Sequence, residues 1–159
     1  TLSGLGRGFR KDRAGQAPLL IGGGVGVPPL YRLARELRGA ELPVRAALGF
    51  NTAEEAFLVA EFEALGVEVE IATMDGSLGV LGTALDACQF DRASYFYACG
   101  PTAMLRALCE RTGLPGEMSL EERMGCGFGA CMGCTVNTVT GPQRVCKEGP
   151  VFPREVLAW

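Results

Sequence analysis

Pro18-Leu-Leu-Ile-Gly-Gly-Gly-Val-Gly-Val-Pro28-Pro29 is the stretch that decides the fold. Residues Pro18–Ile21 form a short apolar run that predicts a buried strand. The glycine-rich loop after this run ends in two prolines, which suit the first turn of a helix because no N–H is needed there. Apolar residues then recur with helical spacing at Leu30, Leu33, Ala34 and Leu37. The stretch therefore predicts a strand, a loop and a helix, in that order.

The alternation of strands and helices continues to residue 111. Further strands are predicted at Val44–Phe50, Val67–Thr73 and Ser94–Ala98. Further helices are predicted at residues 52–65, 80–88 and 102–111. Thr52 and Glu55 should form a capping box at the start of the first of these, and Thr102 should cap the last. The side chains expected to point inward from the first are Ala53, Ala56, Phe57, Ala60 and Ala64. This order indicates an α/β fold with a parallel sheet and right-handed crossovers.

The loop between the first strand and helix is a candidate nucleotide site. Parallel sheets bind ligands at the carboxyl ends of their strands. Successive glycines let the backbone approach a pyrophosphate, and the helix N-terminus adds about half a unit of positive charge. A plain tight turn is the alternative, and the loop is not a standard G-x-G-x-x-G. The glycines and the strand–helix context favour dinucleotide binding. The candidate residues are Gly22, Gly23, Gly24, Gly26 and Pro28.

A second loop, Cys99-Gly100-Pro101, follows the strand at Ser94–Ala98. In a doubly wound sheet it should lie beside the first loop, with Cys99 facing the cleft. A buried cysteine at a strand end is the alternative for Cys99 alone. Asp75 follows another strand and is a candidate for the adenosine side, although an ordinary turn explains it equally well. No arginine is placed to meet a ribose 2′-phosphate and acidic residues lie nearby, so NAD is favoured over NADP.

Four cysteines near the C-terminus have the spacing C-x4-C-x2-C-x11-C. They are Cys126, Cys131, Cys134 and Cys146. The first two intervals match the plant-type [2Fe–2S] pattern. Glycines alternate with these cysteines and permit a loop whose amide N–H groups point at sulfur atoms. The cysteines are therefore predicted to bind a [2Fe–2S] cluster and to take part in one-electron transfer.

Three other interpretations of the cysteines compete with this one. The weakest is four unrelated core cysteines, because buried cysteines do not normally cluster between glycines. A structural zinc site also uses four thiolates, but it usually consists of two closely spaced pairs. A disulfide framework is disfavoured, because the chain has seven cysteines, an odd number, and no visible secretory signal. Metal content would separate the zinc interpretation from the iron–sulfur one.

The composition excludes several classes of function. The chain has 159 residues and a formal net charge of −3, so a nucleic-acid partner is not expected. It has no apolar run of about eighteen residues, and thus no predicted membrane span. It has no histidine, which excludes Rieske-type ligation and histidine acid–base catalysis. No paired carboxylates or activated serine stand out, so no catalytic residue is predicted.

The motifs together resemble a known family. The glycine-rich loop and the later Cys99-Gly100-Pro101 are similar to the pyridine-nucleotide domain of the ferredoxin-reductase superfamily. The stretches Ser119–Cys134 and Val145–Phe152 closely resemble the electron-transfer subunits of type B dihydroorotate dehydrogenase. Leu5–Phe9 is similar to the linker that precedes the nucleotide domain in that family. The resemblance covers nearly the whole chain.

The resemblance implies an electron path. NADH would dock on Gly22–Gly26, FAD would lie between the nicotinamide and the cluster, and the four cysteines would hold the cluster. The cluster would exchange single electrons with an FMN-containing catalytic subunit, in a heterotetramer in the cytoplasm. That subunit oxidises dihydroorotate to orotate in pyrimidine biosynthesis, so this chain should have no such activity of its own. A similar subunit of a hydrogenase or of an NADH-dependent ferredoxin:NADP reductase is the alternative.

One departure from the family affects the expected domain organisation. Family members carry a flavin-binding β-barrel of roughly a hundred residues ahead of the linker, whereas this sequence begins at the linker. We therefore expect a fragment, a short form, or a barrel supplied by another chain, and no FAD binding by this chain alone. The expected parts are a linker at 1–17, an NAD-binding domain at 18–115 and a β-rich [2Fe–2S] subdomain at 116–159. The last should contain a strand at Gly116–Glu121 and a hairpin of Thr135–Val139 with Arg144–Cys146.

Overall fold

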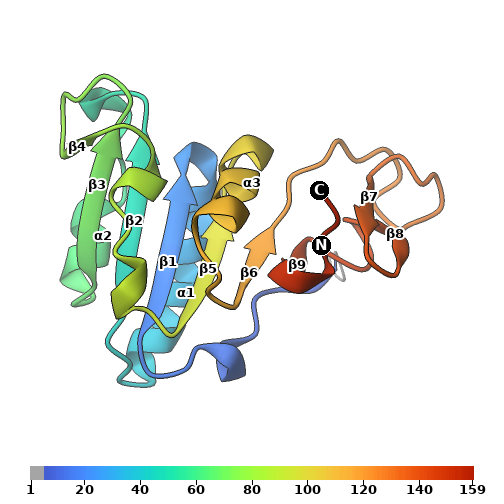
Figure 1. Cartoon of the computed structure of the whole chain (residues 1–159), viewed down its shortest axis with the longest axis horizontal. Coiled ribbons are helices and arrows are strands. Elements are labelled where there is room, and N and C mark those ends of the chain that lie inside the picture. Colours follow the sequence, from blue (N-terminus) through green and yellow to red (C-terminus); the bar gives the residue numbers. More distant parts are fainter. Residues whose placement is uncertain (1–5) are drawn as a thin grey trace.

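A seven-stranded sheet with helices on both faces forms most of the molecule (Figure 1). The computed structural model describes residues 6–159, so the first part of the predicted linker, residues 1–5, lies outside the described residues. The strand order is β4-β3-β2-β1-β5-β6-β9. The strands are β1 (Pro18–Gly23), β2 (Arg45–Phe50), β3 (Glu68–Thr73), β4 (Val80–Leu81), β5 (Tyr95–Cys99), β6 (Gly116–Ser119) and β9 (Val151–Pro153). All neighbouring pairs are parallel except β6 and β9. The predicted α/β fold is confirmed.

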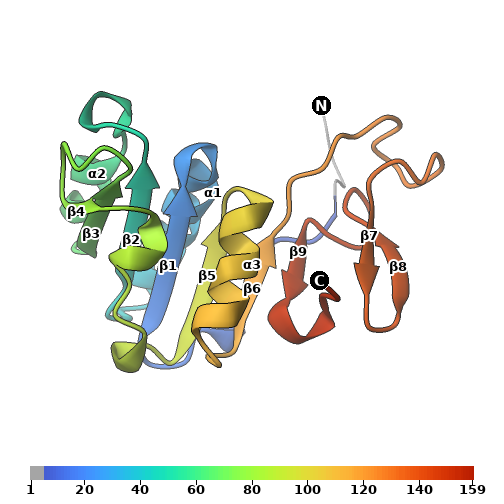
Figure 2. The same ribbon diagram turned by 45° about the horizontal axis from the view of Figure 1, so that its top comes forward.

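The side chains of the central strands alternate between two cores. Leu20 of β1 and Tyr97 of β5 face the core covered by α1 (Val27–Gly39) and α2 (Val59–Ala64). Ile21 and Phe96 face the opposite core, beneath α3 (Thr102–Arg111). Figure 2 shows α3 in front of the sheet and α1 behind it. Because the sheet is covered on both faces, every residue of these two strands is buried.

Two predicted helices are wrong in extent. The helix predicted at 52–65 is a single 3-10 turn, Ala53–Glu55, then a short non-helical link, and then α2, which begins only at Val59. Thr52 makes no side-chain cap, since the carboxylate of Glu55 accepts a hydrogen bond from Asn51 Nδ2 (2.7 Å) instead. Leu58 has a positive φ of 61°, which prevents a continuous helix. Of the predicted inward residues, Ala53 and Ala56 are half-buried and Phe57, Ala60 and Ala64 are exposed; the helix buries Phe62 instead.

The helix predicted at 80–88 is the short strand β4 followed by a single 3-10 turn, Ala84–Asp86. Gly82 separates the two with a φ of 132°, a conformation that ends any helix. Thr83 and Asp86 form the capping box of the turn, with Asp86 Oδ2 accepting from Thr83 N (2.7 Å) and Thr83 Oγ1 (2.8 Å). The helix predicted at 102–111 is present as α3, but Pro101 is its N-cap residue and Thr102 makes no cap.

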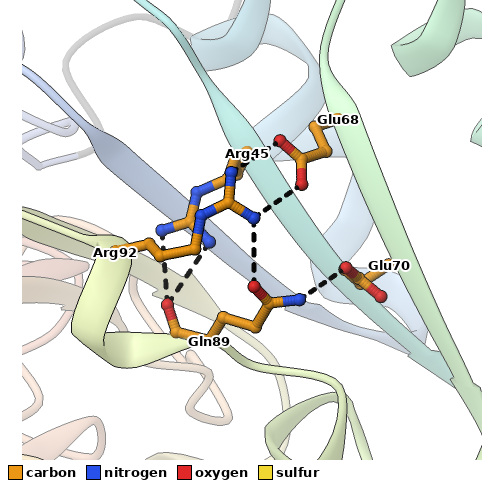
Figure 3. A network of polar contacts seen from close by, with 5 residues as sticks. All are labelled: Arg45, Glu68, Glu70, Gln89 and Arg92. Atoms are coloured by element: carbon orange, nitrogen blue, oxygen red, sulfur yellow. Dashed lines mark hydrogen bonds and ion pairs between the residues drawn. The ribbon is translucent and has the colours of Figure 1, made fainter.

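A polar network ties the amino ends of β2 and β3 to the segment before β5 (Figure 3). Arg45 is only 8% exposed, and both of its terminal nitrogens donate to the carbonyl of Gln89 at 3.3 Å. Arg92 donates to Glu68 Oε1 (3.0 Å), and Gln89 Nε2 donates to Glu70 Oε1 (2.9 Å). Burial lowers the pKa of Arg45. The network fixes the sheet at the end opposite the glycine-rich loop.

The C-terminal segment shares a core with the sheet. The predicted hairpin is present as β7 (Thr135–Thr138) and β8 (Gly141–Arg144), but the bounds of its second strand are wrong, because β8 shares only Arg144 with the predicted Arg144–Cys146. Cys134, Val145, Cys146 and Phe152 pack in the same cluster as Phe96 and Met118 of the sheet. Strand β9 was not predicted, and it joins the sheet through β6.

The N-terminal segment is held against this junction. Arg10 forms an ion pair with Glu117, whose side chain is 1% exposed, and Tyr97 Oη donates to the carbonyl of Arg10 (2.7 Å). Among residues 6–159, no helix is long and apolar enough to cross a bilayer.

The Thr83–Asp86 box gives a stability prediction. The Thr83 amide and, second, the Arg111 guanidinium hold the pKa of Asp86 at about 2, below its ordinary value of about 3.9. Replacing Asp86 with Asn should lower the unfolding free energy by about 1 kcal/mol. Because the folded pKa is depressed, this difference should be complete above pH ~4 and should shrink as pH falls toward ~2. Urea unfolding of both proteins between pH 7 and pH 2.5 measures it.

Glu110→Gln, at an exposed position on α3, is the control. It should show no comparable difference from the parent protein. A constant difference between Asp86→Asn and the parent over the whole pH range would contradict the assignment.

Candidate functional site

The two candidate loops meet at the carboxyl edge of the sheet. Strands β1 and β5 are neighbours, and Gly22 pairs with Cys99 in register. A Cβ on Gly26 would lie 2.1 Å from the carbonyl oxygen of Cys99, which is an impossible contact. Gly26 therefore allows the start of α1 to rest directly on the end of β5. The predicted proximity of the two loops is confirmed.

A cleft of about 210 Å³ opens beside these loops. Its lining residues are Gly23, Gly24, Gly49, Phe50, Asn51, Glu55, Met74, Thr83, Ala84, Pro101 and Met104. Most come from the carboxyl ends of β1, β2, β3 and β5, where a doubly wound sheet binds ligands, and the rest from the turn at Ala84 and from α3. Among these lining residues, Glu55 alone carries a charge. The cleft is thus apolar, with backbone amides on one side and one carboxylate on the other.

The predicted nucleotide residues occupy different positions around the cleft. Gly23, Gly24 and Pro101 line it. Gly22, Gly26 and Gly100 are buried behind this lining, and Pro28 is exposed on the first turn of α1. Their roles in binding stay predictions.

Cys99 and Asp75 do not line the cleft. Cys99 is 3% exposed, and burial raises the pKa of its thiol to about 11. The expectation that its side chain faces the cleft is wrong, because it packs in the core beneath α1. The carboxylate of Asp75 accepts hydrogen bonds from Ser77 Oγ (2.6 Å) and Ser77 N (3.0 Å), which lower its pKa. Asp75 therefore shapes the turn, and its neighbour Met74 lines the cleft.

Two contributors to the cleft, Gly49 and Glu55, were not among the predicted site residues, although the acidic residues of this stretch were expected near the ribose. A Cβ on Gly49 would lie 2.6 Å from the amide nitrogen of Ala84, so this glycine brings the turn of Ala84 against the end of β2. A glycine at the carboxyl end of an apolar strand is a sequence signal that could have identified Gly49 as a site residue. Glu55 was assigned to a helix cap, but it lines the cleft and holds Asn51.

The four predicted cysteine ligands lie as two pairs. Cys126 is near Cys131 in the loop, and Cys134 is near Cys146 beside the hairpin. Cys134 and Cys146 are buried, Cys126 is half-buried and Cys131 is exposed. Within residues 6–159, no three His, Cys, Asp or Glu side chains are gathered closely enough to hold a metal ion as they stand.

Backbone amides point at these sulfur atoms. Ala130 N and Cys131 N donate to Cys126 Sγ at 3.3 and 3.4 Å, and Gly133 N donates to Cys131 Sγ at 3.4 Å. Cys146 N donates to Cys134 Sγ at 3.5 Å. The amides, that of Cys131 first, lower the pKa of Cys126 to about 6, and the Cys146 amide lowers that of Cys134.

The loop gives little room beside these sulfurs. A Cβ on Gly125 would lie 3.3 Å from Cys131 Sγ, and one on Gly133 would lie 3.5 Å away. Four thiols, amides directed at sulfur and glycines between them form a donor set that fits an iron–sulfur cluster.

Comparison with known proteins also indicates an iron–sulfur site in the C-terminal segment. Residues 121–158 match the model of the iron–sulfur cluster binding domain of dihydroorotate dehydrogenase B. The chain is 48% identical over 159 residues to the dihydroorotate dehydrogenase B (NAD(+)) electron transfer subunit of Geobacillus thermodenitrificans, and 46% identical to that of Bacillus caldolyticus. Each match covers 95% of this chain and 62% of the relative, so the chain spans less than two thirds of their length.

A solved structure agrees over both parts of the chain. It is that of an NADH-dependent reduced ferredoxin-NADP oxidoreductase, with a TM-score of 0.77 and 31% identity. The match covers 90% of this chain and 54% of that chain. The ferredoxin-reductase type of fold is therefore established for the sheet and for the segment that carries the cysteines.

The contact at Gly26 gives a prediction for the cleft. Gly26→Ala should separate the two loops and lower the unfolding free energy by about 3 kcal/mol, because the new methyl group meets backbone atoms that cannot move alone. Gly39→Ala, at the end of α1, meets no atom within 4 Å and should be neutral or stabilising by less than ~1 kcal/mol. Thermal and urea unfolding measure both. Equal stability of the two variants would contradict the close approach.

Proposed function

Because the chain belongs with the electron transfer subunits of dihydroorotate dehydrogenase B over the 62% of their length that it spans, we propose that it relays electrons between a catalytic subunit and NAD. In this proposal a partner subunit with FMN oxidises dihydroorotate to orotate for pyrimidine biosynthesis. The main support for this proposal is that one hydrophobic core connects the sheet that carries the cleft with the segment that carries the four cysteines. The proposed parts are a linker to residue 17, an NAD-binding domain at 18–115 and a cluster subdomain at 116–159.

The cleft is the proposed NAD site. Gly23 and Gly24 leave the backbone open to a pyrophosphate, and the N-terminus of α1 adds a partial positive charge there. Glu55 lies in the same cleft and its carboxylate can accept hydrogen bonds from ribose hydroxyls. The apolar side chains of Met74 and Met104 supply adaptable contact surfaces for the rings. This arrangement supports NAD and disfavours the extra phosphate of NADP.

The cysteine loop is the proposed [2Fe–2S] site, held by Cys126, Cys131, Cys134 and Cys146. When bound, such a cluster accepts and gives single electrons. The chain supplies the thiolates and the amides that donate to them. Nicotinamide exchanges two electrons as hydride, so a flavin is needed between the two sites. FAD is therefore part of the proposal, bound by the flavin-binding barrel that the family resemblance places ahead of the linker.

Exposed apolar side chains surround the cysteine loop and support a docking role. Met124, Phe128 and Met132 are 45%, 73% and 48% exposed. Methionine and aromatic side chains are enriched at protein interfaces. We assign this surface to the catalytic subunit; the heterotetramer, the FMN of the partner and the cytoplasmic location stay predictions.

A similar role in another complex is the second candidate. The structural match to a ferredoxin-NADP oxidoreductase over 90% of the chain favours it. Its identity of 31% is lower than the 48% to the dihydroorotate dehydrogenase subunit. We therefore keep dihydroorotate oxidation as the first proposal.

The cluster is tested first by its content. The chain purified without oxygen should contain iron and sulfide in equal amounts and should lose visible absorbance on addition of dithionite. Cys131→Ser should abolish both. Cys88→Ser should keep both, because Cys88 packs against β2 and β3, away from the loop, and its Sγ donates to Ala84 O (3.2 Å). Far-UV circular dichroism should show the sheet intact in both variants. Zinc without sulfide in the parent protein would refute the redox proposal.

The nucleotide preference is tested at Glu55. The parent protein should bind NADH more tightly than NADPH, because the Glu55 carboxylate repels a 2′-phosphate. Glu55→Gln should narrow the ratio of the two Kd values by about tenfold, equivalent to ~1.4 kcal/mol. Isothermal titration calorimetry measures both. Glu54→Gln, at an exposed residue outside the cleft lining, is the control and should leave the ratio unchanged. If Glu55→Gln left the ratio of the two Kd values unchanged, the proposed contact between Glu55 and the ribose would be wrong.

A further inference from the structure

The peptide unit between Gly129 and Ala130 is bonded at both of its polar ends. Its N–H, on Ala130, donates to Cys126 Sγ at 3.3 Å. Its carbonyl, on Gly129, accepts from Arg144 Nη1 at 2.7 Å. One peptide thus connects the guanidinium of β8 to the sulfur of the first predicted ligand. Since the two bonds point the same way along the peptide dipole, each strengthens the other.

Arg144 is held in place before any ligand is considered. Its Nε donates to Glu148 Oε2 (2.9 Å) and its Nη2 donates to Glu148 Oε1 (2.5 Å), a bidentate pair. The same carboxylate accepts from the backbone amide of Arg144 (2.8 Å). Both side chains are half-buried, at 23% and 28% exposure. Nη1 is therefore already directed at the Gly129 carbonyl, and the arginine side chain needs no further ordering to donate to it.

The backbone around this contact is tightly packed. Gly129 has a φ of 90°, and a Cβ there would lie 3.0 Å from Lys147 Cδ and 3.2 Å from Arg144 Nη1. The amides of Lys147, Glu148 and Gly149 all donate to the carbonyl of Arg144, which closes a tight turn around Cys146. The loop of the first two cysteines consequently rests on the turn that carries the fourth.

We propose that Arg144 is a positioning residue for the cluster: it orients the Gly129–Ala130 peptide toward Cys126 and raises the reduction potential of a [2Fe–2S] centre bound there. The inference rests on the proposed cluster site. Reduction adds one electron and one negative charge to the centre. A fixed positive charge and a polarised amide N–H both favour the more negative state, and hydrogen bonds to sulfur and net charge set such potentials. Glu148 holds Arg144 and offsets part of its charge.

The test is the midpoint potential of the loaded full chain, titrated with dithionite and followed by visible absorbance and by electron paramagnetic resonance. Arg144→Gln removes the charge and should shift the potential to a more negative value. Glu148→Gln removes the opposing charge, keeps one acceptor for the guanidinium, and should shift the potential in the positive direction. Arg144→Lys keeps the charge and should fall between the parent protein and Arg144→Gln.

Arg154→Gln is the matched control. Arg154 also binds backbone carbonyls, those of Cys109 (2.8 Å) and Leu114 (3.3 Å), but it lies away from the cysteine loop. The potential of this variant should equal that of the parent protein. Opposite shifts in Arg144→Gln and Glu148→Gln, with no shift in the control, would establish the role.

Equal potentials in the parent protein and in the Arg144 and Glu148 variants would overturn the inference while leaving the proposed function intact. Shifts of the same sign in Arg144→Gln and Glu148→Gln would also overturn it, because a merely loosened loop has no reason to follow the sign of the charge. If Arg144→Gln retains no iron or sulfide, Arg144→Lys and Glu148→Gln decide the question. A parent protein without iron and sulfide would instead refute the proposed function, and the inference with it.

Discussion

The rest of the structure depends on the close backbone approach of Gly26 to the carbonyl of Cys99. This contact joins the start of α1 to the end of β5, although about seventy residues separate them in sequence. At this contact the chain passes from β1 into α1, which covers one face of the sheet, while α3 covers the other face. The cleft lies at this point because no side chain of Gly23 or Gly24 fills it. A single methyl group at residue 26 would therefore disturb both the packing and the candidate site.

The shared core explains how a small cysteine segment keeps a defined position. Residues 120–150 contain only the short hairpin and long loops, too little apolar material for a stable fold of their own. Val145, Cys146 and Phe152 pack on Met118, and β9 pairs with β6, so the sheet provides the missing core. The buried Glu117, paired with Arg10, adds a contact from the N-terminal segment at the same junction.

The elements predicted correctly from the sequence are those for which one strong local signal decides the outcome. The apolar runs predicted the strands, and the glycine and proline pattern predicted the two loops and their meeting point. The predictions for 52–65 and 80–88 were wrong, because helical periodicity was overridden by backbone conformations at Leu58 and Gly82 and by Glu55 bonding to Asn51. Strand β9 has three residues, too few for a pattern, and exists because β6 offers it a partner. Cys99 was misplaced because a strand-end residue can point to either face.

The two candidate sites use the same chemistry with different support. In the proposed function each would present backbone amides to an anion, a pyrophosphate at the start of α1 and thiolates in the cysteine loop, and each needs glycines because a side chain would block the approach. The first set of amides is fixed by the sheet and the helix themselves. The second lies in a loop without regular structure, so a side chain must hold it. The guanidinium of Arg144 on the Gly129 carbonyl supplies that support, and its charge falls where negative charge would accumulate. The position of this arginine thus follows from the lack of secondary structure around the cysteines, which is a reason the spacing of the cysteines alone did not reveal it.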